Sequence, residues 1–519
     1  MEDNYKWLPQ LENSIPKSAY GYGVSIYSIA LEGWRRGLQL SFSNLYHKGS
    51  QKYVLKYTLS DGNNSVSFRH TRSSKVSTKA VNICVDKDLT KQYLKKAGVP
   101  TPEGKAFDKG TDFTELNKIA HEIGYPVTIK PVDGKGGKGV FGNINSDHDL
   151  NESIKYLIED LGSENIIIEK YITGEDYRVF VVGEKAVGAF RRLPANVVGN
   201  GTDTIEKLLA DKNAKRVEIP GMYKKPITIT REVHKMLRSK GYTMKSVPSK
   251  GEFVALKTKN NVSSGGDPIE ASHELTEEMK NIAVNAVKAV PGLVQAGVDL
   301  IVNHDENYGV VLEMNSKPSI RNHLYPMIGE APDIPKELID YYFPETINKG
   351  YVSDKPLFYF EYDPVKQLVL ENNVKELLIS NHPTGAFIVK KIHLLGSFKE
   401  DITINWLKKL FNRYKLHGSV EFLKTTSVEL KITANEENYN EFIMELTNKK
   451  SKNIIVESFE IEDYNEPISI GFNLKESKAL VKENKNLKKQ LEKNRKELNK
   501  LKQQYSKKRI LKFLKINKE

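Results

Sequence analysis

A glycine-rich loop between two strand-like runs is the feature that most constrains the fold of this chain. Residues 127–131 form a short, mostly apolar run that contains Lys130, and the chain continues as Val132-Asp-Gly-Lys-Gly-Gly-Lys-Gly139. Residues 140–144 then resume as a second strand-like run. Glycines let backbone amides close around a phosphate, and the lysines of the loop add positive charge. The segment predicts a nucleotide-phosphate clamp, and a surface hairpin with solvated lysines is the alternative.

Two well-known glycine motifs do not describe this loop. Gly134, Gly136 and Gly139 satisfy the G-x-G-x-x-G pattern of dinucleotide-binding folds, but that fold requires the loop to open a helix. The residues after Gly139 resemble a strand instead. The Walker pattern fails because Val140 occupies the position of its lysine. The sequence therefore predicts a hairpin lid over a triphosphate, with Lys130 on the strand before it.

The length and composition limit the class of protein. A chain of 519 residues is too long for one hydrophobic core and suggests three or four domains. The single cysteine, Cys84, excludes an internal disulfide framework and a cysteine-based zinc site. No stretch approaches the about 18 consecutive apolar residues of a membrane span, and the first residues lack a signal-peptide pattern. We therefore expect a cytoplasmic protein.

The positive charge is concentrated at the C-terminal end. The net charge is +13, and residues 475–519 contribute +12 of it through 17 Lys/Arg and 5 Asp/Glu. A nearly neutral body makes nucleic acid an unlikely partner. Residues 507–516 place cations beside apolar side chains, so this basic tail could contact an anionic membrane or an acidic partner. A frayed basic end is the alternative.

Leucines and asparagines repeat with heptad spacing after Phe472. Four heptads with asparagines at the seam suggest a coiled coil that could mediate self-association or bind a partner helix, and a single solvated helix is equally compatible. The two seam positions hold Leu480, Leu487, Asn494 and Leu501, and Asn484, Leu491, Leu498 and Tyr505.

Composition and periodicity divide the chain into five parts. A small N-terminal α/β region shows a helical stretch, a probable hairpin around Ser60–Asn64 and no catalytic motif. The next part mixes helices and strands, and a linker follows it. The fourth part has the strand and helix order βαββαβ of a split-βαβ sandwich, and the last is the basic coiled-coil helix and tail. The predicted boundaries are 1–80, 81–345, 346–384, 385–472 and 473–519.

The strand Ile166–Ile168 leads into a segment suited to a nucleoside. Its backbone can offer adenine a donor and an acceptor where the strand ends, through Glu169 or the backbone of Lys170 and Tyr171. Ile172 suits the face of the base, and the carboxylate of Asp176 suits the ribose hydroxyls. An ordinary strand end with exposed charge would show the same residues.

Two later strand-like segments carry candidate metal ligands. In residues 309–315, strand alternation places Glu313 and Asn315 on one face and the neighbouring apolar residues on the other. If residues 297–302 form the adjacent strand, Asp299 joins them. Two carboxylates and an amide oxygen are hard ligands suited to Mg²⁺ that bridges phosphates. Exposed acids on an edge strand are the alternative.

These segments, in this order, resemble an ATP-grasp ligase. The resemblance covers about residues 80–345 and implies an ATP-grasp fold there. With the βαββαβ order of residues 385–472 and the heptads that follow, the expected fold class is α+β: an ATP-grasp fold, then a ferredoxin-like (acylphosphatase-like) domain, then a C-terminal coiled-coil helix. Within the family, the sequence is most similar to the ATP-grasp domains of cyanophycin synthetases and bifunctional glutathione synthetases. The motifs that carry this likeness are Asp86-Lys-Asp-Leu-Thr-Lys91, Gly174-Glu-Asp-Tyr-Arg178, Asn261-Val-Ser-Ser-Gly-Gly266, Ala296-Gly-Val-Asp299 and Asn315-Ser-Lys-Pro-Ser-Ile-Arg321.

The resemblance implies ATP and Mg²⁺ as cofactors and a role for each candidate residue. Arg321 would lie near an acyl phosphate and act in catalysis together with Lys130, and residues 261–266 would line the substrate side. Arg191 and Arg192 are weaker candidates for binding a substrate carboxylate, since paired arginines are more often plain surface residues. The nucleotide would be bound by Lys87, Lys130, Lys138, Glu169, Lys170, Ile172 and Asp176, and the metal by Asp299, Glu313 and Asn315.

The implied reaction joins a carboxylate to an amine through an acyl phosphate, with an amino acid or peptide as the expected substrate. Residues 390–461 resemble an acylphosphatase, but Phe422 replaces its active-site asparagine and Ile404 or Asn405 its arginine. We therefore interpret this part as a non-catalytic ferredoxin-like module. Two alternatives stay open: an acylphosphatase-type hydrolase, and an ATP-binding scaffold whose basic tail contacts a membrane or acidic partner.

Overall fold

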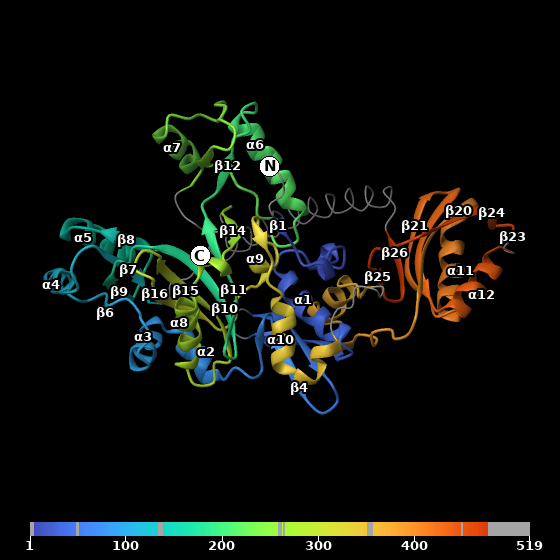
Figure 1. Ribbon diagram of the computed structural model, residues 1–519, viewed down its shortest axis with the longest axis horizontal. Coiled ribbons are helices and arrows are strands. Elements are labelled where there is room, and N and C mark those ends of the chain that lie inside the picture. The colour runs from blue at the N-terminus through green and yellow to red at the C-terminus, as the bar shows by residue number, and fades with distance from the viewer. Residues whose placement is uncertain are drawn as a thin grey trace, which may run out of the picture. The chain divides into compact units, whose positions relative to one another are not determined.

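The computed structural model divides the chain into two compact units (Figure 1). Unit 1 comprises residues 1–352 and 361–382, and unit 2 comprises residues 353–360 and 383–519. Within them, the structure describes residues 5–47, 51–132, 139–257, 262, 265–349, 357–447 and 450–475.

A four-stranded antiparallel sheet in unit 1 contains the two runs that flank the glycine loop. The strand order is β6-β9-β7-β8, and β7 pairs with β8 as the sequence predicts. Asp112 and Ser146 cap the helices that pack on this sheet, because their side chains accept hydrogen bonds from first-turn amides. The elements are β6 (Gly104–Asp108), α4 (Phe113–Ile123), β7 (Val127–Pro131), β8 (Phe141–Ile144), α5 (Asp147–Lys155) and β9 (Asn165–Lys170).

A five-stranded antiparallel sheet forms the second layer of unit 1, with the order β14-β11-β10-β15-β16. One face carries an apolar cluster shared with helices α2, α3 and α8, and Val179, Val298 and Met314 belong to it. The elements are α2 (Thr78–Val85), α3 (Lys87–Lys96), β10 (Glu175–Val182), β11 (Lys185–Leu193), β14 (Asp267–Glu270), α8 (Glu277–Lys288), β15 (Gln295–Asn303) and β16 (Tyr308–Asn315).

A small subdomain extends from this sheet and has an apolar cluster of its own (Figure 1). Buried Asp267 ties it to β14, because its carboxylate pairs with Arg216 at 2.6 Å and with Lys212 at 2.5 Å. The elements are β12 (Asn196–Val198), α6 (Ile205–Glu218), α7 (Arg231–Ser239) and β13 (Phe253–Ala255).

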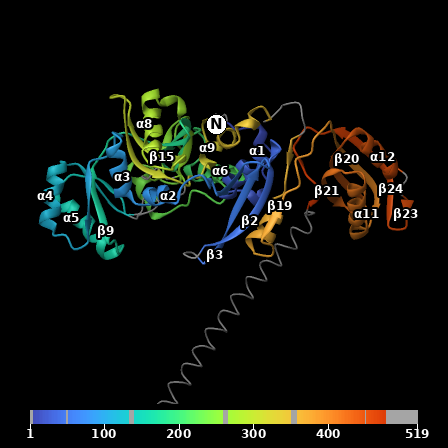
Figure 2. The same cartoon turned by 90° about the horizontal axis from the view of Figure 1, so that it is seen from below.

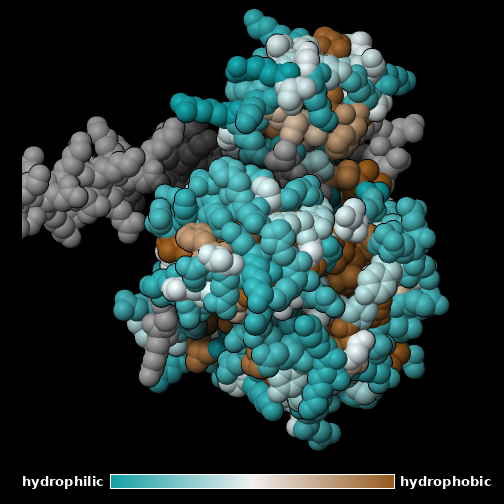
Figure 3. All heavy atoms as spheres, turned by 90° about the vertical axis from the view of Figure 1, so that its left-hand side faces the viewer, coloured by the Kyte–Doolittle hydropathy of each residue, from teal (hydrophilic) through white to brown (hydrophobic). Residues whose placement is uncertain are grey.

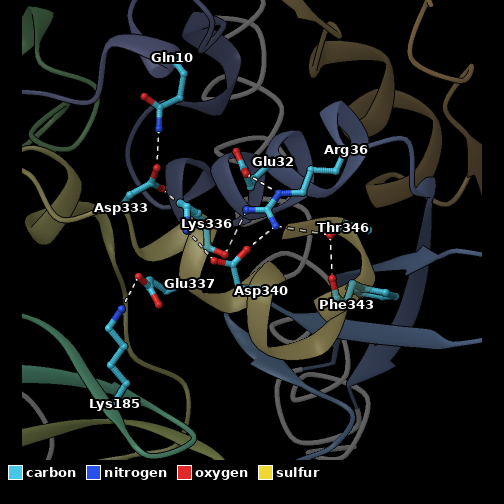
Figure 4. A network of polar contacts seen from close by, with 10 residues as sticks. All are labelled: Gln10, Glu32, Arg36, Lys185, Asp333, Lys336, Glu337, Asp340, Phe343 and Thr346. Atoms are coloured by element: carbon cyan, nitrogen blue, oxygen red, sulfur yellow. Dashed lines mark hydrogen bonds and ion pairs between the residues drawn. The ribbon is translucent and has the colours of Figure 1, made fainter. Parts of the chain in front are cut away.

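The N-terminal region packs within unit 1 against helix α10. Arg36, at the end of α1, is buried and reaches Glu32 at 2.7 Å and Asp340 at 2.5 Å (Figure 4). The same figure shows Gln10 donating to Asp333 at 2.6 Å, at the start of α10. These contacts join the two ends of unit 1. The elements are β1 (Tyr5–Lys6), α1 (Gly23–Arg35), β2 (Gln39–His47), β3 (Lys52–Ser60), β4 (Ser65–Arg69), β5 (Arg72–Ser73), α9 (Arg321–Leu324), β17 (Gly329–Glu330) and α10 (Ile334–Tyr342).

The segment predicted as a linker, residues 346–384, carries structure of its own. Strand β19 (Glu376–Leu378) pairs with β2 and extends the N-terminal sheet to the order β19-β2-β3-β4-β5. Tyr362, Val365 and Val369 are buried. Residues 361–382 therefore belong to unit 1, because an edge strand offers backbone groups with which a distant segment can pair.

Unit 2 has the predicted βαββαβ order. Its central strands are arranged β24-β20-β22-β21, and α11 and α12 pack on this sheet (Figures 1 and 2). The acylphosphatase likeness stays a prediction, and the coiled coil lies outside the described residues after Lys475. The elements are β18 (Phe358–Tyr359), β20 (Ile388–Phe398), α11 (Glu400–Arg413), β21 (His417–Lys424), β22 (Ser427–Ala434), α12 (Glu436–Thr447), β23 (Lys450–Ser451), β24 (Ile454–Asp463), β25 (Ile468–Ser469) and β26 (Phe472–Lys475).

Hydrophilic side chains cover most of the face shown in Figure 3, and apolar side chains appear there in smaller groups. A mixture of this kind is normal for a protein surface in water. Among the described residues, no helix is both long enough and apolar enough to cross a membrane.

Candidate active site

A cavity of about 610 Å³ is lined by residues from the four-stranded sheet and from the five-stranded sheet β14-β11-β10-β15-β16. The four-stranded sheet contributes two lysines and one glutamate, and the five-stranded sheet contributes three carboxylates and two arginines. The polar and charged lining residues are Lys87, Thr128, Lys130, Glu169, Lys170, Tyr171, Asp176, Arg178, Arg192, Asp299, Glu313, Ser319, Arg321 and Asn322.

Lys130 and Glu169 line one end of the cavity, and the Glu169 carboxylate is shared by two lysines. Lys130 on β7 pairs with one carboxylate oxygen of Glu169 at 2.5 Å, and Lys91 on α3 pairs with the other. All three side chains are buried. Burial acts to raise the pKa of Glu169, but the two ammonium groups hold it below its ordinary value. The trio therefore carries a net charge of +1, which suits a site for an anion.

The carboxylate of Glu169 therefore forms ion pairs with Lys91 and Lys130 in this structure, whereas the sequence analysis predicted that Glu169 binds the nucleoside. Lys91 was given no role by sequence reasoning. It lies four residues after Lys87 on α3, so helical periodicity places both lysines on one face of the helix. That spacing was the available signal for Lys91.

The other nucleotide-binding candidates lie around the same end. The Nζ atom of Lys87 is 3.4 Å from the backbone oxygen of Pro131. Lys170 donates from its Nζ atom to the backbone oxygen of Gly124 at 2.7 Å, so its ammonium holds the chain before β7. Ile172 lines the cavity beside Tyr171. Lys138 lies outside the described residues, as do Asn261, Ser263 and Ser264 of the substrate-side loop.

Asp299 and Glu313, two of the predicted metal ligands, line another part of the same cavity. Strands β15 and β16 are antiparallel neighbours, and their register places Asp299 opposite Glu313 and Gly297 opposite Asn315. The amide nitrogen of Asn315 donates to Glu313 at 3.2 Å. Burial and the nearby charge of Asp299 raise the pKa of Glu313. The strand pairing thus brings together the two carboxylates and the amide that the sequence predicted.

Two arginines balance the negative charge of these acids. The sequence analysis gave Arg178 no separate role and named Arg192 only as a weaker candidate for binding a substrate carboxylate. Arg178 on β10 binds Asp299 with two nitrogens, one of them at 2.6 Å, and Arg192 on β11 lies 3.2 Å from the same carboxylate. Arg192 also pairs with Asp176 at 2.6 Å. Burial acts to raise the pKa of Asp299, but Arg178 and Arg192 hold it below its ordinary value.

Asp176 therefore lies beside the metal-ligand candidates rather than apart from them. Its pKa is raised by burial and by Asp299, against the opposing effect of Arg192. Strand alternation gives the reason, because Asp176 and Arg178 are two residues apart on β10 and share one face. Asp176, Asp299 and Glu313 against Arg178 and Arg192 leave a formal charge of −1 when all are ionised, which suits a cation.

Arg321 begins helix α9 and lines the cavity. Its Nε and Nη1 atoms are buried and make no hydrogen bond within the described part of the chain. Its guanidinium carbon lies 4.7 Å from the ring centre of Tyr22, a cation–π contact. Burial lowers the pKa of Arg321. An arginine that lines a cavity and keeps two donors unpaired suits an anionic ligand.

Two segments of the chain match models of known protein families. Residues 86–185 match the family model "Carbamoyl-phosphate synthase L chain, ATP binding domain", and residues 242–341 match the model "RimK-like ATP-grasp domain". The chain contains an ATP-grasp domain. The two matched segments include the predicted phosphate-binding lysines and metal ligands, respectively.

This chain is also similar in sequence to proteins from two groups of synthetases. It is 32% identical over 329 residues to cyanophycin synthetase of Trichormus variabilis, which covers 62% of this chain and 35% of that protein. It is 31% identical over 332 residues to the glutathione biosynthesis bifunctional protein of Clostridium perfringens, which covers 62% of this chain and 41% of that protein. The chain therefore spans less than half the length of these relatives.

Among solved structures, the chain is similar to a bifunctional glutathione synthetase from Pasteurella multocida. The sequence identity is 26% and the TM-score 0.45, with 56% of this chain and 40% of that chain covered.

Proposed function

We propose that this protein is an ATP- and Mg²⁺-dependent ligase that joins a carboxylate to an amine through an acyl phosphate, with an amino acid or peptide as substrate. The observation that carries the proposal is the division of charge within one cavity. The end that contains Lys91, Lys130 and Glu169 has a net positive charge, and the end that contains Asp299 and Glu313 offers oxygen ligands. Mg-ATP presents phosphates and a divalent cation together, so both ends have a partner in one ligand.

The residues at the acidic end fit a magnesium ion. Asp299, Glu313 and Asn315 supply two carboxylates and an amide oxygen, which are the hard ligands that Mg²⁺ prefers. When bound there, Mg²⁺ would neutralise phosphate charge during transfer. Because Arg178 and Arg192 hold the pKa of Asp299 below its ordinary value, the Asp299 carboxylate is ionised at neutral pH and can bind a cation.

The proposed reaction has two steps that balance. A substrate carboxylate oxygen attacks the γ-phosphorus of ATP, the bond to the β–γ bridging oxygen breaks, and ADP leaves. The amine nitrogen then attacks the acyl carbon, phosphate leaves with the former carboxylate oxygen, and the amine loses a proton. Lys130 and Arg321 would hold phosphate oxygens by charge-assisted hydrogen bonds, and positioning of this kind provides much of the catalysis in phosphoryl transfer.

A cytoplasmic location is part of the proposal, because ATP-dependent ligation requires cellular ATP. The single thiol fits a role in packing, since burial raises the pKa of Cys84 to about 12 and leaves little thiolate. Self-association through residues 473–519 and contact of the basic tail with a membrane stay predictions.

The test is a screen of amino acids and short peptides for ATP-dependent phosphate release. Glu313→Gln keeps the size of the side chain but removes a ligand charge, so we expect kcat to fall about 100-fold or more. Glu306→Gln is the matched control, because Glu306 is an exposed acid in the turn between β15 and β16. Turnover by the Glu313 variant equal to that of the Glu306 control would refute the metal assignment. Absence of turnover with every pair of carboxylate and amine would refute the ligase.

A further inference from the structure

The N-terminal region of unit 1 lines a second cavity, of about 690 Å³. Its walls come from β2, β3, the β4–β5 hairpin, the start of α1 and the segment around Lys366. Residues as far apart in the sequence as Tyr20 and Leu370 meet there, and sequence analysis found no functional motif in the N-terminal part. The cavity is therefore a product of the tertiary structure.

The charged side chains that line this cavity are all basic. Arg69, Arg72, Lys317 and Lys366 lie around it with His47 and His70, and the described lining includes no aspartate or glutamate. Asp363 is the nearest acid with an effect on Lys366, and it lies outside the lining. Four tyrosines complete the polar lining. A cavity with several cations and aromatic rings suits an organic anion.

Two of the cations stand next to each other without a counter-ion. Arg69 and Arg72 face each other across the β4–β5 pair, and neither forms an ion pair with a described acidic residue. Burial and the charge of Arg69 lower the pKa of Arg72. Like charges placed directly opposite each other on a sheet destabilise it. A bound anion would remove this repulsion.

Two further groups at the cavity favour an anion. His70 has two buried ring nitrogens without a hydrogen bond to any described residue, although the backbone of Tyr22 is close enough to influence the pKa of the ring. Helix α1, which has 13 residues, begins at the cavity with Gly23. Its first turn carries no acidic residue and no side-chain cap, so no side chain of that turn balances the positive end of the helix dipole.

The second cavity shares a wall with the ATP cavity. Tyr22 lines the second cavity, and its ring stacks on Arg321, which lines the first. Lys317 and Ser319 lie on opposite sides of the same loop, because Lys317 lines the second cavity and Ser319 the first. Thr71 fixes this loop by donating to the backbone oxygen of Pro318 at 2.6 Å. A ligand in the second cavity therefore lies next to the phosphate-binding arginine.

We propose that the N-terminal cavity binds the anionic, non-reacting part of an acidic substrate, such as the side-chain carboxylates of a glutamate- or aspartate-rich peptide. The inference rests on the proposed ligase function in one respect, namely that the substrate's reacting carboxylate would reach the ATP cavity past Arg321. Binding itself requires only the second cavity. The cations Arg69, Arg72 and Lys366 would hold the carboxylates, and the tyrosines would contact the aliphatic stems.

Titration calorimetry with tetraglutamate tests the proposal independently of turnover. The full chain is first saturated with a non-hydrolysable ATP analogue and Mg²⁺, so that the ATP cavity cannot take the peptide. We expect tetraglutamate to bind and tetraglutamine not to bind. Replacing Arg69 and Arg72 together by glutamine should weaken the binding of tetraglutamate at least tenfold, because the variant loses two charged donors to the peptide carboxylates.

Two controls separate a lost contact from a damaged fold. Replacing the same two arginines by lysine keeps the charges and should retain most of the affinity. Lys118→Gln removes one charge from exposed α4, outside both cavities, and should leave the dissociation constant unchanged. Equal affinity of the glutamine double variant and the unmodified chain, or equal binding of tetraglutamine, would overturn the proposal. Failure of the ligase would appear instead as absent phosphate release while tetraglutamate still binds.

Discussion

Glu169 is the residue whose neutralisation should most clearly reveal the charge arrangement of the ATP cavity. Its carboxylate is the shared partner of two ammonium groups, and Glu169, Lys91 and Lys130 are 3%, 5% and 7% exposed. Glu169→Gln preserves shape but leaves two buried cations side by side without their counter-ion. Removal of one partner from a buried ion pair typically costs about 3–5 kcal/mol. We expect a loss of unfolding free energy in this range at neutral pH.

Thermal unfolding and urea titration of the full chain would measure the loss. A cost of about 3 kcal/mol corresponds to a fall in Tm of roughly 4 °C for a cooperative unit as long as unit 1, because the entropy of unfolding grows with chain length. Glu164→Gln is a matched control, because Glu164 lies just before β9 and pairs with Lys109 on the surface, where both side chains are more than half exposed. Exposed pairs contribute little, so the control should change stability by less than about 1 kcal/mol.

The pH dependence of Glu169→Gln gives a second, independent check. The folded-state pKa of Glu169 lies below its ordinary value, so the unmodified chain gains stability from this group above the unfolded-state pKa of about 4.3. That gain is lost as the pH falls through the folded-state pKa. The difference between the two proteins should therefore be full above about pH 5 and shrink in more acidic solution. Equal stability of Glu169→Gln and Glu164→Gln at pH 7 would refute the reasoning.

Three further predictions concern other parts of unit 1. Asp267→Asn should destabilise the subdomain of α6 and α7 by about 3–5 kcal/mol, because Arg216 and Lys212 lose their buried counter-ion; faster hydrogen exchange confined to this subdomain would verify the loss. Tyr22→Leu should lower kcat/KM about two- to fivefold by removing the cation–π contact to Arg321, whereas Tyr22→Phe should retain the rate; identical losses in the two variants would contradict the contact. Removal of Mg²⁺ with excess chelator should abolish both phosphate release and the rise in Tm produced by ATP, and a rise that persists without metal would count against the acidic end as its site.

Local patterns predicted the elements well where capping and alternation agree. Helix α4 occupies Phe113–Ile123 because Asp112 caps its start and Gly124 with positive φ ends it. The metal-ligand candidates were found for a similar reason. Alternation along β16 placed Glu313 and Asn315 on one face, and pairing with β15 brought Asp299 opposite.

Other features depend on contacts that no local pattern encodes. Strand β19 joins β2 through backbone hydrogen bonds, so its three side chains carry little information about the pairing. The roles of Lys91 and Arg178 became visible only when their partners Glu169 and Asp299 were placed beside them. The second cavity combines residues from the two ends of unit 1 and could not be read from any one segment.

The positions of the two cavities suggest why Arg321 is buried with two unpaired donors and a contact to the ring of Tyr22. A buried guanidinium without hydrogen bonds at Nε and Nη1 is unfavourable unless a ligand completes it, and the ring of Tyr22 offers only partial compensation. An acyl phosphate on the side of the first cavity would supply the missing acceptors. Tyr22 at the same time borders the second cavity, so a peptide that fills it would press the ring against Arg321. A ligand in the N-terminal cavity and an acyl phosphate in the first cavity would therefore contact the two members of one cation–π pair, Tyr22 and Arg321.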